Sequence, residues 1–314
     1  MSNFNRRNFL RTGLLSATFL ISPAAVALAK TSSLSDLGKL LVMDATITIY
    51  SAREIVTLDP SQPTASAVAV VNDRILACGT LDEVKAAVGD RPYQMDTTFQ
   101  DKVVVPGFIA QHAHPLLASL SMASEILSIE DWELPTVTVP ALKDKADFVE
   151  RLTAAEAKLS TPDEVLFSWG YHAAFYGPLT RSDLDEISTS RPVIIWLRSC
   201  HEFVMNSYAL EQAGVTQDLM DGWGKSAQEQ SSFLEGHFWE QGMFSVLPHI
   251  APMVANPDKF NEGALMMRKY MHSKGITFGN EPGGILAKPV QDAVNSVMSD
   301  SSMPFRSSFM ADGK

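Results

Sequence analysis

The chain has 314 residues, which is enough for one large domain or two modest ones. Hydrophobic residues make up 46% of it and charged residues 19%, proportions typical of a globular protein with a buried core. The formal net charge of −11 speaks against nucleic-acid binding, because affinity for nucleic acid comes largely from cationic contacts with phosphate.

The first residues have the order of an export signal. A basic stretch around Arg6-Arg7 is followed by an apolar run over 14–21 and by Ala27-Leu28-Ala29, an A-x-A cleavage pattern. The paired arginines are typical of a twin-arginine signal. They predict the twin-arginine export machinery as a partner and a periplasmic or otherwise exported location. Removal of residues 1–29 takes away three arginines and lowers the net charge from −11 to −14.

The alternatives for this segment are a buried N-terminal helix and a membrane anchor. The apolar run is shorter than the roughly 20 residues that span a bilayer. No later segment of the sequence is long and apolar enough to do so, and no membrane span is expected in the mature chain.

The two cysteines, Cys78 and Cys200, are predicted to be buried free thiols. A disulfide is the alternative in an oxidising compartment, although the two residues fall in different predicted structural units. A two-cysteine zinc site is not expected, because metal-binding cysteines usually come in closely spaced pairs.

Residues 30–103 are predicted to form a small, mostly β subdomain. Apolar strands over 67–71 and 74–78 flank Asn72-Asp73, residues that tolerate a positive φ and favour a tight β-hairpin. A short helix is expected over 81–88, because Thr80 and Glu83 have the spacing of a capping box.

Residues 104–314 alternate between strand and helix patterns. Val103-Val104-Val105 is a continuous apolar run, as expected for a strand buried on both faces. Apolar residues at helical spacing predict an amphipathic helix over 142–159. The remaining predicted elements are strands over 164–169, 193–197, 276–278 and 304–310, a short helix after Thr180, and a helix over 260–272 that ends at Gly275. This alternation favours a parallel α/β sheet or barrel.

The segment expected to carry the chemistry ends the first of these strands, and it reads Pro106-Gly107-Phe108-Ile109-Ala110-Gln111-His112-Ala113-His114. Alternate residues of a strand point the same way, so His112 and His114 can direct both imidazoles to one point past its carboxyl end. Barrel enzymes place their active sites at that end, and neutral imidazole is a common zinc ligand. By itself a His-x-His pair is a weak signal, since pairs of surface histidines are also common.

At this segment the sequence resembles the amidohydrolase superfamily, whose first barrel strand ends in a Pro-Gly-Phe-Ile-Asp-x-His-x-His type of motif. Ala110-Gln111 stands where an aspartate and a small residue are usual. Further matches, in order, resemble the branch called amidohydrolase family 3: Trp169-Gly170-Tyr171-His172, Leu179-Thr180-Arg181, Arg191-Pro192-Val193, His201 and Asn206-Ser207-Tyr208-Ala209-Leu210.

The resemblance implies an α/β fold, a (β/α)8 TIM-type barrel with a small N-terminal β-sandwich subdomain. It also implies a divalent metal ion, zinc, with His112 and His114 as ligands. The implied reaction is hydrolysis of a C–N, amide-type bond in a small-molecule substrate.

Three further residues are candidates for substrate binding. His201 follows the predicted strand 193–197 and either lines the pocket or bonds to local backbone. His172 also follows a predicted strand, but the family usually has an acidic residue there, which leaves its role open. Glu281 lies just beyond the predicted strand 276–278, and it either supports a metal-binding residue, lines the pocket or lies on a surface loop.

Enzymes of this superfamily also have a carboxylated lysine or glutamate on the fourth barrel strand, histidines on the fifth and sixth, and a general-base aspartate on the eighth. None of these can be assigned before Lys314, and neither can strands that complete the small β subdomain. The chain is therefore expected to be the first half of a truncated barrel, over 104–314, and not a competent hydrolase by itself. A catalytic zinc normally has three protein ligands.

Two alternatives remain open. One is an enzyme of the same fold that acts on C–O bonds or isomerises its substrate. The other is a non-catalytic periplasmic binding protein derived from the fold, since fold alone does not fix function.

Overall fold

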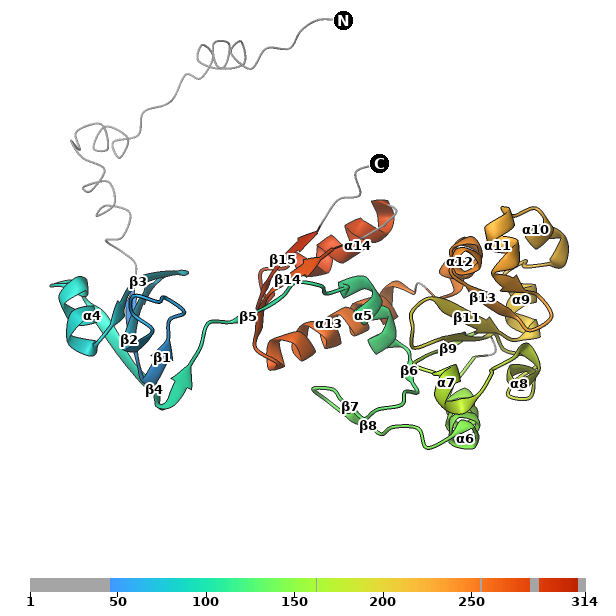
Figure 1. Cartoon of the computed structure of the whole chain (residues 1–314), viewed down its shortest axis with the longest axis horizontal. Coiled ribbons are helices and arrows are strands. Elements are labelled where there is room, and N and C mark those ends of the chain that lie inside the picture. Colours follow the sequence, from blue (N-terminus) through green and yellow to red (C-terminus); the bar gives the residue numbers. More distant parts are fainter. Residues whose placement is uncertain (1–45, 162, 255, 283–287, 310–314) are drawn as a thin grey trace, which may run out of the picture. The chain divides into compact units, whose positions relative to one another are not determined.

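The computed structural model describes residues 46–161, 163–254, 256–282 and 288–309, which form two compact units that meet between Pro106 and Gly107 (Figure 1). The predicted signal peptide, 1–29, lies outside the described residues. Within those ranges, no helix is long and apolar enough to cross a bilayer.

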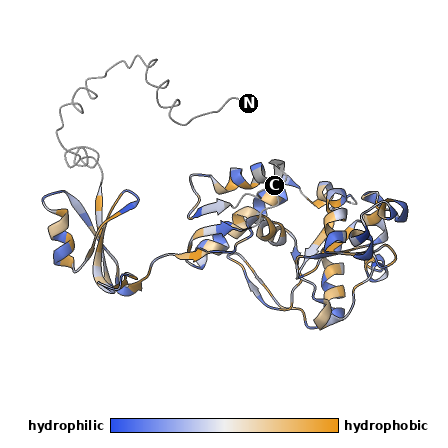
Figure 2. Ribbon diagram, turned by 45° about the horizontal axis from the view of Figure 1, so that its top comes forward, coloured by the Kyte–Doolittle hydropathy of each residue, from blue (hydrophilic) through white to orange (hydrophobic). Residues whose placement is uncertain are grey.

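The first unit is one four-stranded sheet with a helix on one face. The strands have the order β3-β2-β1-β4; the β1–β2 and β2–β3 pairs are antiparallel, and the β1–β4 pair is parallel. The elements are β1 (Ile47–Val56), β2 (Thr64–Val71), β3 (Arg74–Gly79), α4 (Leu81–Val88) and β4 (Tyr93–Val104). Figure 2 shows hydrophobic and hydrophilic residues both present along α4. Its buried residues, Val84 and Val88, pack with Ile47 and Ile49 of β1. The predicted β-sandwich is replaced, within the described residues, by this single sheet and its helix.

The local turn and cap signals of this unit are confirmed. Asn72-Asp73 joins β2 to β3, and Asn72 has a φ of 55°. The Thr80 hydroxyl accepts from the backbone N–H of Glu83, and the Glu83 carboxylate accepts from the backbone N–H of Thr80 at 2.8 Å. This reciprocal pair is the predicted capping box at the start of α4.

The prediction that the triple-valine run is a strand buried on both faces is wrong. Val103 and Val105 are 43% and 48% exposed, and β4 ends at Val104. Pro106 has no backbone N–H to continue a strand ladder. The next strand therefore begins only at Phe108, in the second unit.

The described residues of the second unit form three sheets: β15-β14-β5, β12-β13-β11-β10-β9-β6, and the two-stranded pair β7-β8. The strands are β5 (Phe108–Ala110), β6 (Glu125–Ile126), β7 (Trp132–Glu133), β8 (Thr138–Val139), β9 (Leu166–Trp169), β10 (Val193–Trp196), β11 (Glu202–Met205), β12 (Ser231–Ser232), β13 (His237–Trp239), β14 (Ile276–Glu281) and β15 (Arg306–Phe309). The helices are α5 (Pro115–Ala123), α6 (Lys145–Glu156), α7 (Ala173–Tyr176), α8 (Arg181–Asp185), α9 (Ser207–Gln212), α10 (Gln217–Asp221), α11 (Lys225–Glu229), α12 (Gln241–Val254), α13 (Pro257–Ser273) and α14 (Lys288–Met298).

The chain leaves the smaller parallel sheet after β5, builds the six-stranded sheet, and returns at β14 (Figure 1). Strand β14 pairs in parallel with both β5 and β15. The β6–β9 and β9–β10 pairs are also parallel, but β11, β13 and β12 continue that sheet with antiparallel pairs. The fold is thus mixed α/β with several sheets, and the described residues contain no closed barrel. The sequence predicted one parallel sheet or barrel for these strands, but β5 belongs to one sheet, and β9 and β10 belong to another.

A tight turn after β10 explains the change of direction. The backbone N–H of Leu197 donates to the carbonyl of Glu202 at 3.0 Å, and that of Cys200 donates to the carbonyl of Leu197 at 2.9 Å. Cys200 has a φ of 62°, a left-handed conformation that closes the turn. So short a connection can join only antiparallel strands, because a parallel crossover needs about a dozen residues or more.

The prediction of a fully buried strand at β10 is confirmed. Val193 and Ile195 face one hydrophobic cluster and Ile194 and Trp196 face another, so the strand has core on both sides. Each of the four is at most 3% exposed.

Both cysteines are free, as predicted, but they are only partly buried and not fully buried. Cys78 lies on β3 of the first unit and Cys200 in the turn after β10 of the second. Burial raises the pKa of each thiol, which makes both poor nucleophiles near neutral pH.

Candidate metal site

The two histidines of the His-x-His segment lie directly after β5 and face each other. His112 Nε2 and His114 Nε2 are 3.0 Å apart, and the rings meet edge to face with centroids 4.7 Å apart. Two nitrogens bound to one tetrahedral zinc at ~2.0–2.1 Å are about 3.3–3.4 Å apart. A movement of a few tenths of an ångström therefore fits this pair to one ion.

Strand β14 holds this segment in place. The backbone N–H of Ala113 donates to the carbonyl of Asn280 at 2.9 Å, and Asn280 Nδ2 donates to the carbonyl of Gln111 at 3.2 Å. At the other end of β5, the N–H of Phe108 donates to the carbonyl of Gly275 at 2.8 Å. Because β5 and β14 are parallel, their carboxyl ends meet at one edge of the sheet.

Gly107 permits the close approach of these strands. A Cβ at this position would lie 2.1 Å from the side chain of Thr277 on β14. The glycine of the Pro-Gly motif thus has a packing role: it lets β5 begin beside β14, which aims the following histidines at the end of that strand.

Glu281, the last residue of β14, supports the histidine pair. It is 4% exposed, and its Oε1 lies 2.7 Å from His114 Nδ1. A carboxylate at that distance accepts the Nδ1–H of a neutral imidazole, so the lone pair of His114 is left on Nε2. Burial on β14 excludes the surface-loop alternative for Glu281.

No third metal-binding side chain joins the pair in the part of the chain that the structure describes. There, no group of three or more His, Cys, Asp and Glu side chains is arranged to hold a metal ion. Glu281 contacts the far nitrogen of His114 and so acts through that ring. The residues present fit two ligands of a metal ion and a carboxylate that orients one of them.

The other two predicted histidines lie elsewhere. His201, in the turn before β11, has a 57% exposed side chain, and its Nδ1 is 3.2 Å from the carboxylate of Glu240. His172 follows β9 and contacts the ring of Phe175 edge-on. No hydrogen bond between described residues joins either of them to the His-x-His pair. Their role in substrate binding stays a prediction.

The Asn-Ser-x-Ala-Leu match has a structural basis at its asparagine. Asn206 is fully buried, and its Oδ1 accepts from the backbone N–H groups of Val193, at 3.0 Å, and Ala209, at 2.8 Å. Its Nδ2 donates to the carbonyls of Ser188 and Arg191 at 2.7 and 2.9 Å. One side chain therefore caps α9 and ties it to the start of β10.

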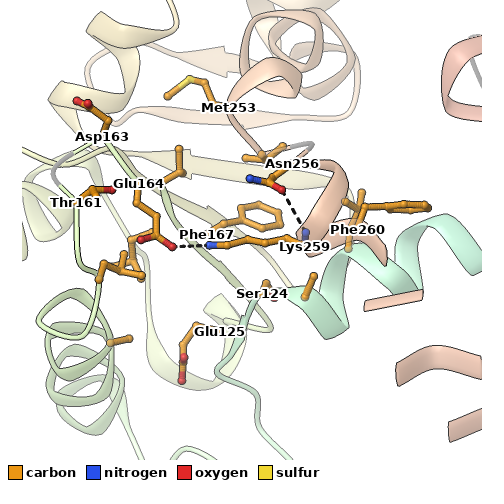
Figure 3. A pocket seen from close by; sticks show the side chains of 17 residues that line it. Ser124, Glu125, Thr161, Asp163, Glu164, Phe167, Met253, Asn256, Lys259 and Phe260 are labelled. Carbon is orange, nitrogen blue, oxygen red and sulfur yellow. Dashed lines mark hydrogen bonds and ion pairs between the residues drawn. The ribbon is translucent and has the colours of Figure 1, made fainter. Parts of the chain in front are cut away.

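A cavity of about 540 Å³ lies at the amino end of β9, beside the start of α13 (Figure 3). Lys259 Nζ and Glu164 Oε1 pair there at 2.8 Å, and this hydrogen bond lowers the pKa of the Glu164 carboxyl. Ligand sites of α/β sheets lie at the carboxyl ends of strands. This cavity is at the opposite end, and its lysine is already paired, so it is not a candidate catalytic site.

Sequence reasoning named Glu281 as one candidate support of the metal site, but it missed the contact with His114 and the role of Asn280. The sequence signal that could have found these two residues was their position at the end of a predicted strand. Both residues end a strand whose carboxyl edge meets that of β5, but the neighbour relation of β5 and β14 has to be known to use it.

No protein-family model matches the chain. It is similar to the Long After Far-Red 3 protein of Arabidopsis thaliana, with 28% identity over 226 residues, 71% of this chain and 36% of that protein. It is also 28% identical over 179 residues to an N-substituted formamide deformylase of Arthrobacter pascens, covering 56% of this chain and 31% of the relative. A solved structure, that of an uncharacterized metal-dependent hydrolase from Pyrococcus horikoshii, matches 85% of this chain and 48% of its own, with a TM-score of 0.60 and 15% identity.

The chain thus spans about a third of the length of these two curated relatives and about half of the solved structure. The similarity to the deformylase is one of sequence, and the likeness to the solved hydrolase is one of fold. Both agree with the resemblance to the amidohydrolase superfamily that the motif around His112 and His114 carries.

Proposed function

We propose that this protein is a metal-dependent hydrolase that cleaves a C–N, amide-type bond in a small molecule, with His112 and His114 as ligands of a zinc ion. The observation that carries the proposal is the pair of Nε2 atoms 3.0 Å apart at the end of β5, one of them backed by a buried carboxylate. The similarity to a formamide deformylase supports the bond type. Since the chain spans only part of its relatives, the activity is proposed for the whole protein.

The residues present have defined tasks in this proposal. His112 and His114 bind through Nε2, and Glu281 fixes the orientation of the His114 ring by accepting its Nδ1–H. When bound, a zinc ion supplies a water of lowered pKa and polarises the substrate carbonyl. His172 and His201 stay candidates for substrate contact, and the contact between Glu281 and His114 favours the supporting role for Glu281 in this proposal.

The metal part of the proposal can be tested on the chain itself. We expect zinc to bind the wild-type chain and to bind His112→Asn and His114→Asn about a hundredfold more weakly, as measured by competition with a chelating dye. His272→Asn is the matched control, because His272 is exposed in the last turn of α13. Equal zinc affinity in all four proteins would exclude the assigned ligands.

The reaction is tested with the protein from the full reading frame. Zinc-loaded protein is given matched amide, ester and lactone substrates, and release of the amine from the amides and of the acid from the esters and lactones is followed. Amide cleavage that stops on chelation supports the proposal. Turnover of esters or lactones but of no amide would replace it with C–O hydrolysis.

We also infer that β5, β14 and β15 are neighbouring strands of a (β/α)8-type barrel, with the six-stranded sheet as an insertion between β5 and β14. Their parallel pairing and the likeness in fold to the solved hydrolase support this. A crystal structure of the whole protein in which these three strands belong to an open sheet would contradict it.

Export by the twin-arginine route is likewise inferred, from Arg6-Arg7 and the apolar run that follows. Replacement of both arginines by lysine should keep a reporter fused to residues 1–29 in the cytoplasm. Export of that double variant at the unaltered rate would exclude the route.

A further inference from the structure

A cavity of about 440 Å³ lies at the carboxyl ends of β9 and β10, and its lining includes Tyr171, His172, Arg198, Ser199 and Glu202. Its volume is within the range of about 300–1,000 Å³ that small-molecule sites occupy. The crevice beyond the carboxyl ends of parallel strands is also the usual ligand position in open α/β sheets. Size and place both favour a binding site.

Arg198 is held in a fixed orientation at this cavity. Its guanidinium lies over the ring of Trp169, 5.5 Å from the centroid, and its Nη2 donates to Glu130. Nη2 makes this hydrogen bond, and no hydrogen bond to another described residue uses Nε or Nη1. The side chain is 33% exposed, so its other N–H groups can reach a ligand.

The acidic side chains near the cavity already have donors on both oxygens. Glu202 accepts from Ser199 Oγ at 3.2 Å and from His237 Nε2 at 2.8 Å, and the hydrogen bond from His237 lowers the pKa of this carboxyl. Glu130 accepts from Arg198 and, at 3.0 Å, from Ser128 Oγ. Because these carboxylates are already paired, the side chains left to bind a ligand are the guanidinium of Arg198 and the imidazole of His172.

His172 supplies the second such nitrogen. Its imidazole packs edge-on against Phe175, with ring centroids 4.9 Å apart, and no hydrogen bond between described residues uses its ring atoms. It lines the same cavity as Arg198. A guanidinium and an imidazole on one small cavity are suited to a planar acceptor such as a carboxylate.

The rest of the lining is apolar. Ile129, Leu197, Ala173 and Ala174 present hydrocarbon, and Tyr171 presents its ring. The Tyr171 hydroxyl donates to the carbonyl of Gly177 at 3.0 Å, and burial raises its pKa to about 12, so it stays neutral. The cavity therefore has an apolar body and a polar end.

We propose that this cavity binds a small organic carboxylate. Its apolar part lies against Ile129, Leu197 and Tyr171, and its carboxylate accepts hydrogen bonds from Arg198 and His172. The site goes beyond the proposed hydrolase function and does not depend on it, because it uses neither of the metal-binding histidines.

The test is a ¹⁹F NMR titration of the metal-free 314-residue chain with 4-fluorobenzoate and with its neutral isostere 4-fluorobenzamide. We expect saturable binding of the benzoate and binding of the benzamide at least about tenfold weaker, because only the carboxylate makes charge-assisted hydrogen bonds. Since metal is absent, failure here leaves the hydrolase proposal untouched.

Three variants separate recognition of the carboxylate from an effect on local packing. Arg198→Gln should weaken benzoate binding about tenfold or more, and His172→Gln should weaken it to a lesser extent. Glu130→Gln keeps its shape but removes the negative charge that competes for Arg198, so it should tighten binding about twofold or more. Lys225→Gln, a change at an exposed lysine of α11, is the matched control and should have no effect.

The decisive result is that Arg198→Gln weakens benzoate binding while Glu130→Gln tightens it. If the Arg198–Glu130 pair only maintains the local fold, Arg198→Gln and Glu130→Gln both weaken benzoate binding, and the proposal fails. It also fails if benzoate does not saturate, if benzamide binds as well, or if Arg198→Gln has the affinity of the wild type.

Discussion

His114 and Glu281 are 167 residues apart in the chain, yet His114 Nδ1 lies 2.7 Å from a carboxylate oxygen of Glu281. The contact exists because β14 pairs in parallel with β5, so both residues stand at the same edge of one sheet. A buried carboxylate on the far nitrogen of a metal-binding imidazole fixes the tautomer and the ring orientation.

Zinc affinity should depend on this contact. We expect Glu281→Gln to bind zinc about tenfold more weakly and Glu281→Ala up to about a hundredfold more weakly, since outer partners of metal-binding histidines contribute that much. Glu262→Gln, at an exposed position of α13, is the control. Competition with a chelating dye gives the affinities, and an unchanged value for Glu281→Ala would show that the carboxylate does not position His114.

Packing of α5 on α13 should depend on Gly263. A Cβ there would lie 1.9 Å from the backbone carbonyl oxygen of Ser119, which cannot move without shifting α5. We expect Gly263→Ala to lower the free energy of unfolding by about 1–3 kcal/mol, despite the better helix propensity of alanine. Gly224→Ala, where the added Cβ meets nothing within 4 Å, should change it by about 0.5 kcal/mol or less. Urea unfolding distinguishes the two, and equal midpoints would refute the close contact.

The buried amide of Asn206 should be among the most sensitive positions of the six-stranded sheet. Asn206→Ala removes four hydrogen bonds and leaves buried N–H and C=O groups without partners. The expected loss is about 3 kcal/mol or more in the free energy of unfolding. Thr216→Ala removes an exposed cap of α10 and should cost only about 1 kcal/mol. A smaller loss for Asn206→Ala than for Thr216→Ala would contradict this assignment.

The pairing of Glu164 with Lys259 should make stability depend on pH. The hydrogen bond from Lys259 lowers the folded-state pKa of Glu164 below its ordinary value of 4.5. Its stabilising effect is therefore fully present above that value and is lost as the pH falls through the lowered pKa. Because both side chains are partly exposed, the effect at neutral pH should be below about 1 kcal/mol.

Glu164→Gln provides the comparison. Wild type should be the more stable protein at about pH 7, and the two curves should converge toward about pH 3. In a chain that already carries Lys259→Met, adding Glu164→Gln should leave the pH dependence of stability nearly unchanged, because the partner of the carboxylate is gone. A constant offset between wild type and Glu164→Gln across this range would show that protonation of Glu164 is not the cause.

Local elements could be predicted from the sequence, because their signals lie within a few residues of one another. Thr180, after which a short helix was predicted, forms a capping box with Asp183 at α8, and the predicted helix over 260–272 lies within α13. The His-x-His motif likewise identified both candidate metal ligands. Such features depend on side-chain spacing and on backbone preferences, which a sequence states directly.

The sequence does not show which strands are neighbours, and this became known from the folded chain. Nothing in the local pattern shows that β14 pairs with β5, or that the turn at Cys200 sends β11 back along β10. Strand pairing is a competition among many long-range partners with similar apolar surfaces, and its outcome depends on the packing of the whole unit. For that reason the sequence named His114 as a candidate, while the fold supplied Glu281 as the carboxylate beside it.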